Sequence, residues 1–184
     1  NVASLPLRPP VVLAKSVATL DLVTGGRVDL GLGAGGFWDP IVAAGGTRLT
    51  RAQSVDALRE GIEVIRGVWR SDGRSVHVDG EHHRVVGLHP GPAPAHEVEI
   101  WVGAYKPRML RLTGRYADGW LPSMGYADPD ALPDLNDGRL NGLIGDDVSV
   151  DWATLSLRVA TLPSTVVTSL PAVIPFTLDV VGAD

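Results

Sequence analysis

Residues 26–40 have the sequence GRVDLGLGAGGFWDP, a short apolar run that ends in a cluster of glycines. The part RVDLGLG is rich enough in apolar residues to predict a mostly buried strand. Glycines directly after a strand indicate that the backbone approaches something closely, often a phosphate or a flat ring. The stretch therefore predicts a strand whose carboxyl end contributes to a ligand site.

The segment before this strand predicts a helix. Residues 8–26 read RPPVVLAKSVATLDLVTGG, with prolines suited to a first helical turn and Gly25-Gly26 suited to the end. The apolar residues that fall near helical spacing, and so predict its buried stripe, are Val12, Val17, Leu20 and Val23.

A second helix is predicted from Thr50 onward. Thr50 and Gln53 stand three residues apart, as in a capping box, in which each side chain binds the free N–H of the other residue. The residues that then repeat at intervals of three and four, and predict one apolar stripe, are Val55, Leu58, Ile62, Ile65 and Trp69.

The alternation continues along the chain. Residues 75–87, SVHVDGEHHRVVG, predict a hairpin with Asp79-Gly80 as a two-residue turn. Residues 98–104, VEIWVGA, predict a buried strand, residues 107–119 a helix that Pro107 opens, and GWLPS the start of another strand. Helices that alternate with buried strands are typical of an α/β protein with parallel strands.

Composition narrows the function classes. The chain of 184 residues suits one domain, and its net charge of −5 argues against a nucleic acid or an anionic membrane as partner. No apolar run reaches the roughly 18–20 residues that span a bilayer. Cysteine is absent, which excludes disulfides and thiolate catalysis and favours a cytoplasmic location. We expect no metal site, because the adjacent His82 and His83 of the hairpin point to opposite faces of a strand.

The glycine cluster has two further interpretations, a dinucleotide fingerprint and a structural turn. Gly31, Gly33 and Gly36 match G-x-G-x-x-G, the dinucleotide fingerprint of NAD-binding Rossmann dehydrogenases. That fingerprint requires a helix opening at the third glycine, whereas Phe37-Trp38-Asp39-Pro40 follows here. The other interpretation is that the glycines form a turn with a purely structural role.

Three blocks of sequence carry a family resemblance. Residues 5–46 read LPLRPPVVLAKSVATLDLVTGGRVDLGLGAGGFWDPIVAAGG. Residues 56–70 read DALREGIEVIRGVWR and are followed by VDGEHHRV at 78–85, and residues 99–123 read EIWVGAYKPRMLRLTGRYADGWLPS. In this order they resemble the bacterial luciferase-like oxidoreductases, which depend on FMN or on the deazaflavin coenzyme F-420. The resemblance covers residues 1–126 as a barrel core segment, and residues 127–184 form a poorly matched segment of the same domain.

The resemblance implies an α/β fold that is part of a (β/α)8 TIM-type barrel. The chain would begin near the end of the third strand, so that the N-terminal strands are missing and a sheet edge is open. An open edge exposes unpaired N–H and C=O groups, so we expect a homodimer or another protein to cover it.

The resemblance also implies an activity and a set of site residues. Family members transfer a hydride through the bound ring to or from a small organic substrate, and some use oxygen. Asp39 is the nearest candidate for a catalytic group, and no complete acid–base pair is visible. The residues that the resemblance places against the cofactor are Val2, Gly33, Ala34, Gly35, Gly36, Trp38, Asp39, Gly103, Ala104, Tyr105 and Lys106. The alternative is a truncated, non-catalytic barrel relic that acts through subunit association.

Overall fold

A computed structural model describes residues 2–122 of the chain. Its main sheet is built from β1 (Ala3–Ser4), β2 (Leu30–Gly33), β5 (Ile100–Ala104) and β6 (Gly119–Pro122). A separate hairpin is formed by β3 (Val76–Asp79) and β4 (Arg84–Leu88). The helices are the 3-10 turn η1 (Leu5–Leu7), α1 (Pro10–Thr24), α2 (Trp38–Ala43), α3 (Arg51–Trp69) and α4 (Pro107–Tyr116). The predicted helices and strands up to residue 122 are thus confirmed in type and order, whereas residues 127–184 lie outside the described part.

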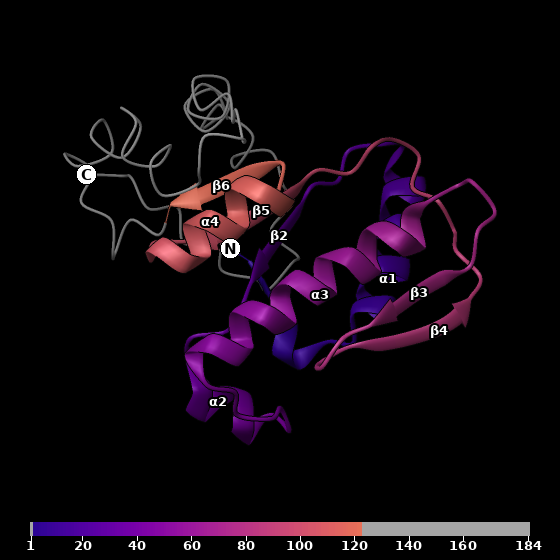
Figure 1. The fold of residues 1–184 in the computed structure, drawn as a ribbon. Coiled ribbons are helices and arrows are strands. Elements are labelled where there is room, and N and C mark those ends of the chain that lie inside the picture. The colour runs from indigo at the N-terminus through magenta and orange to yellow at the C-terminus, as the bar shows by residue number, and fades with distance from the viewer. Residues whose placement is uncertain (1, 123–184) are drawn as a thin grey trace, which may run out of the picture.

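The topology of the main sheet identifies the architecture. All its strands are parallel, and their spatial order, β1-β2-β5-β6, is also their order along the chain. The helices α1, α3 and α4 connect successive strands and pack side by side over one face of the sheet (Figure 1). A doubly wound Rossmann sheet would reverse its strand order and carry helices on both faces. Sequential parallel strands with helices on one face are instead a segment of a barrel wall.

The core lies between the sheet and these helices. Alternate strand residues point towards the helices, and Leu32, Ile100 and Val102 are completely buried there. The predicted stripe of α3 packs against them, with Leu58 and Ile65 also fully buried. The opposite face of the sheet is therefore the face that lines the inside of a barrel.

The predicted stripe of α1 is wrong in all but one residue. Val17 is buried, but Val12 is 57% exposed, Leu20 53% and Val23 80%. The buried face is made by neighbouring positions, among them Leu13, Ala14 and Ala18. Because α1 is apolar almost all the way round, periodicity could not indicate which side faces the sheet.

The predicted two-residue hairpin turn is also wrong. Asp79 pairs with Arg84, so the loop spans residues 80–83. The carboxylate of Glu60, buried on α3, accepts hydrogen bonds from the backbone N–H groups of Glu81, His82 and His83 at 2.8–3.2 Å. A longer loop is needed to direct these three donors at one carboxylate. No helix in residues 2–122 is long and apolar enough to cross a membrane.

Candidate functional site

The carboxyl ends of β2 and β5, which the sequence predicts to form a ligand site, lie beside each other. Leu32 of β2 is in register with Val102 of β5, so the next residues, Gly33 and Gly103, are neighbours at the carboxyl end of the sheet. Both glycines lie on the face of the sheet away from α1, α3 and α4, which we call the open side. This follows because the preceding residues, Leu32 and Val102, point into the core. In parallel α/β barrels, ligand sites lie at this end of the strands.

The side chain of Val2 lies over both glycines. A Cβ added at Gly33 would come within 2.9 Å of Val2 Cγ2, and one added at Gly103 within 3.4 Å of Val2 Cγ1. The two glycines therefore make a recess that Val2 covers, and Val2 itself is 42% exposed. A flat ring can lie against this surface. The peptide bond before Val2 involves Asn1, outside the described residues.

Ser4 is a polar residue in this region that the sequence analysis did not single out. It pairs with Gly33 in the sheet, and its neighbours Ala3 and Leu5 pack against the core, so its side chain faces the open side. Its hydroxyl oxygen is buried and has no hydrogen-bond partner among residues 2–122. A polar residue between two apolar ones, the partly buried Ala3 and the buried Leu5, is the signal that could have revealed it. An unpartnered buried hydroxyl is costly and is a candidate for binding a ligand atom.

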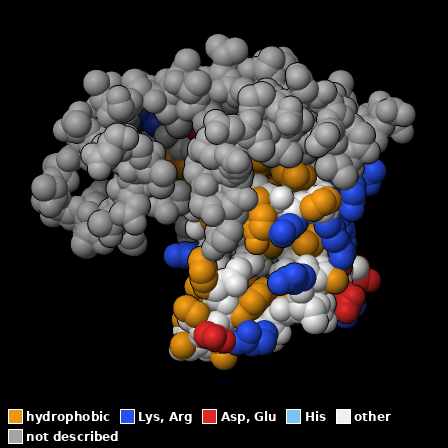
Figure 2. Space-filling model, turned by 90° about the vertical axis from the view of Figure 1, so that its left-hand side faces the viewer, with side chains coloured by type: hydrophobic (Ala, Val, Ile, Leu, Met, Phe, Trp, Pro, Cys, Tyr) orange, Lys and Arg blue, Asp and Glu red, His pale blue; other side chains and the backbone are white. Residues whose placement is uncertain are grey.

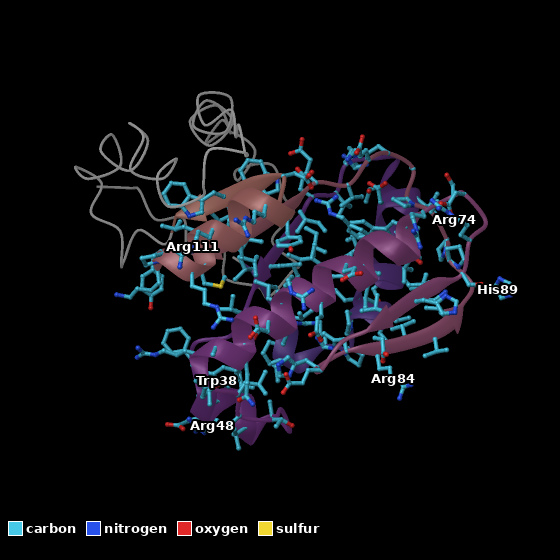
Figure 3. The ribbon with its side chains drawn as sticks, viewed as in Figure 1. Trp38, Arg48, Arg74, Arg84, His89 and Arg111 are labelled. Carbon is cyan, nitrogen blue, oxygen red and sulfur yellow. The ribbon has the colours of Figure 1, made fainter. Side chains whose placement is uncertain are left out.

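The other residues of the glycine cluster lead away from the recess. Gly35 has a φ of +88°, and a Cβ there would meet Pro6, Ile41 and the ring of Trp38. Trp38 begins α2, at a distance from the main sheet (Figure 3). The carboxylate of Asp39 is 91% exposed and is paired with Arg48. Gly36 has open space where a side chain would project.

The end of β5 continues into exposed residues. Ala104 is buried towards the helices, and its carbonyl oxygen accepts a hydrogen bond from Trp120 Nε1 at 2.8 Å. Tyr105 is 46% exposed, and Lys106 Nζ lies 5.3 Å from the centre of its ring. Lys106 is the N-cap of α4, where free N–H groups and a lysine side chain together favour an anion.

The buried carboxylates of the described chain bind backbone instead of lining the recess. Asp21 accepts hydrogen bonds from the N–H groups of Val28, Ala95 and His96, in the segments that lead into β2 and β5. Burial by itself raises the pKa of Asp21, but the hydrogen bonds from the His96 side chain and these backbone groups hold it below its ordinary value. Asp118 is exposed and also binds backbone: its carboxylate accepts a hydrogen bond from the Ile100 N–H at 2.8 Å, and its own N–H donates to the Ile100 carbonyl oxygen at 2.8 Å. The same carboxylate pairs with Arg66. The hydrogen bonds of Asp21 and Asp118 thus hold the amino ends of β2 and β5 in place.

The described histidines contact carboxylates at most in pairs, as His96 Nδ1 does with Asp21 Oδ1 at 2.9 Å. Within residues 2–122 there is no group of three or more His, Asp or Glu side chains that could hold a metal ion. Burial lowers the pKa of the hairpin residue His83, which favours its neutral form.

Comparison with known proteins gives a family match over most of the chain. The model of the family described as luciferase-like monooxygenase matches residues 2–137. The phthiodiolone/phenolphthiodiolone dimycocerosates ketoreductase of Mycobacterium tuberculosis is 39% identical over 123 residues, which cover 62% of this chain and 30% of that protein. The chain thus spans about a third of the length of this relative.

Solved structures show the same fold. An F420-dependent secondary alcohol dehydrogenase, solved with an F420-acetone adduct, is 26% identical with a TM-score of 0.53, over 60% of this chain and 33% of that one. A monooxygenase of Streptomyces bottropensis superimposes with a TM-score of 0.63 at 20% identity, over 79% of this chain and 44% of that one. Both matches cover less than half of the solved chain, as expected for part of a barrel.

Proposed function

Because this chain belongs to the luciferase-like monooxygenase family, we propose that it forms the cofactor-binding part of an oxidoreductase that transfers a hydride with coenzyme F-420. The observation that carries the proposal is the recess at Gly33 and Gly103 beneath Val2. The bound coenzyme would supply the hydride chemistry, and the protein would position its ring.

The residues of the recess fit a flat ring. Side chains are missing at two neighbouring strand ends, and Val2 presents an apolar surface where the ring would rest. The hydroxyl of Ser4, buried without a partner, would supply one hydrogen bond on the same side of the sheet. Lys106 at the start of α4 would neutralise the phosphate of the coenzyme.

For the substrate we propose a ketone or the corresponding secondary alcohol. Two similar proteins are named for this pair of groups, one a ketoreductase and the other a secondary alcohol dehydrogenase. FMN is the alternative cofactor, since monooxygenases share the fold. Asp39 is a poor candidate for the catalytic group, because Arg48 binds its exposed carboxylate. The absence of cysteine is consistent with action in the reducing cytoplasm.

The experiment is a fluorescence titration of coenzyme F-420, and separately of FMN, with the purified chain and with Gly33→Val. We expect saturable binding to the wild type. We expect binding to Gly33→Val to be weaker by about tenfold or more, because the added methyl groups displace Val2 and enter the recess.

Ala44→Val is the control, since it adds the same kind of methyl groups at an exposed position after α2, outside the residues expected against the cofactor. Equal affinity of the wild type and Gly33→Val would show that the recess does not hold the ring. Failure of the folded wild type to bind either cofactor would overturn the proposed function itself.

A second candidate function is association without catalysis. The exposed side chains of Val12, Leu20 and Val23 form one apolar face on α1, the helix at the β1 edge of the sheet. A helix that is apolar on all sides is normally covered. A second copy of the chain that packs through this face would cover it.

A further inference from the structure

The surface between α3 and α4 holds a groove that the proposed function does not use. Its cavity volume is about 210 Å³, and its apolar floor is made by Val55 and Leu112. It lies among the helices, on the side of the sheet opposite Val2 and the two glycines. The charged residues that line it are Asp56, Arg59, Arg108, Arg111 and Arg115.

The positive charge of this groove is only partly neutralised. Arg108 binds both oxygens of Asp56, at 2.7 and 2.8 Å. Arg59 pairs with Glu60 and Glu63 of its own helix. In residues 2–122, neither Arg111 nor Arg115 forms a salt bridge with any carboxylate, so two guanidinium groups face the groove unpaired.

Sequence spacing places these arginines on one side of α4. Arg108, Arg111 and Arg115 are separated by three and four residues, which puts them on successive turns of the same helix face. Like charges at such spacings destabilise a helix, and arginine cannot avoid this repulsion by losing its proton. An arrangement that costs local stability is typical of a binding site.

A larger cavity continues the groove. Its volume is about 540 Å³, and it shares Arg115 and Tyr116 with the groove. It extends to Arg66 of α3, which pairs with Asp118, and to Arg70, directly after that helix. Figure 2 shows blue Lys and Arg side chains beside hydrophobic surface on the side of the molecule where α4 lies. The basic surface is local, because the chain as a whole has a net charge of −5.

We propose that the groove between α3 and α4 binds a small molecule with two adjacent anionic groups, either phosphates or carboxylates. A guanidinium group presents two parallel N–H donors, which match the paired oxygens of both kinds of anion. The Cβ atoms of residues four apart on a helix are roughly 5–6 Å from each other, so Arg111 and Arg115 can each bind one of two neighbouring anionic groups. Tyr116 and the apolar floor would contact the rest of the molecule.

The test is isothermal titration calorimetry of the full chain with pyrophosphate and, in a second arm, with citrate, at matched ionic strength. The variant is Arg111→Gln combined with Arg115→Gln. The control is Arg74→Gln combined with Arg84→Gln, which removes two exposed arginines at the hairpin end of the molecule, far from Arg111 (Figure 3).

We expect saturable binding of pyrophosphate or citrate to the wild type and the control. For the groove variant, we expect affinity to fall by about tenfold or more, because two charge-assisted contacts are lost. The arm that binds more tightly identifies the anion as phosphate or carboxylate. Equal affinities of the groove variant and the wild type, an equal loss in the control, or no binding of either anion to the folded wild type would each overturn the proposal.

Discussion

At the scale of single residues, Glu60 shows how a buried charge can hold two elements together. Its side chain is 4% exposed, and its carboxylate accepts three backbone hydrogen bonds from the loop at residues 81–83. A Cβ at Gly80 would come within 2.2 Å of this carboxylate, so a side chain there would displace it. The contact therefore depends on both a glycine and a glutamate, and it fixes the hairpin to α3.

Replacement of Glu60 should destabilise the chain. We expect Glu60→Gln to lower the free energy of unfolding by about 1–3 kcal/mol, because an amide oxygen is a weaker acceptor and its NH₂ group faces other donors. Urea unfolding followed by circular dichroism would measure this. Glu63→Gln, on the exposed side of the same helix, is the control and should change stability by less than about 0.5 kcal/mol. Equal losses in both variants would contradict the role of Glu60.

Glu60 should also make the free energy of unfolding depend on pH. Burial raises the pKa of Glu60, but the backbone N–H groups of His82, His83 and Glu81 outweigh it and hold the pKa below its ordinary value of 4.5. The unfolded chain therefore takes up a proton first as the pH falls. Stability from Glu60 is fully present above pH 4.5 and is lost as the pH falls through the lower pKa of the folded chain. Unfolding free energy measured against pH should have a shallower acid slope in Glu60→Gln.

At the scale of elements, α3 is the helix around which the described chain is organised. It packs against α1 on one side, α4 on the other, and the hairpin strand β3. Its start is fixed locally: the hydroxyl of Thr50 accepts from the Gln53 N–H at 3.2 Å, and the Gln53 side chain accepts from the Thr50 N–H at 3.0 Å. The predicted capping box is thereby confirmed.

Loss of this cap should be measurable. We expect Thr50→Ala to lower the free energy of unfolding by about 1 kcal/mol, because the first turn of α3 loses an acceptor for a free N–H. Thr47→Ala removes the same atoms from an exposed position outside the helix and should have little effect. Comparison of the two by chemical denaturation tests the cap, and a Thr50→Ala variant as stable as Thr47→Ala would contradict it.

At the scale of the whole molecule, the sheet is a barrel segment, and the helices of residues 2–122 cover only one of its faces. The other face carries Gly31, Gly33, Gly103 and Gly119 alongside Trp101, whose ring lies over Gly119. On the outer side, the apolar face of α1 is exposed. We therefore keep the proposal that a second copy of the chain associates with this one.

Sedimentation analysis tests that association. We expect a dimer or larger species, and we expect Leu20→Lys combined with Val23→Lys to shift it to the monomer, because two charges then lie on the apolar face. Val86→Lys is the control, since Val86 is 68% exposed on the hairpin strand β4. A wild type that is monomeric at high concentration, or a double variant that still associates, would refute packing through α1.

The sequence by itself determined the type and order of the elements and the family. Strand alternation, the capping box at Thr50 and the prolines and glycines at helix ends act between residues a few positions apart, so they can be read directly. The apolar face of α1 that meets the core could not be read, because both sides of that helix carry apolar residues.

Only the tertiary structure decided which distant side chains meet. The position of Val2 over Gly33 and Gly103 depends on the register of three strands that lie up to 100 residues apart. The unpartnered hydroxyl of Ser4, the hydrogen bonds of Glu60 to the hairpin and the arginine groove between α3 and α4 depend on packing in the same way. Such contacts follow from how strands pair and helices pack, and no local pattern in the sequence encodes them.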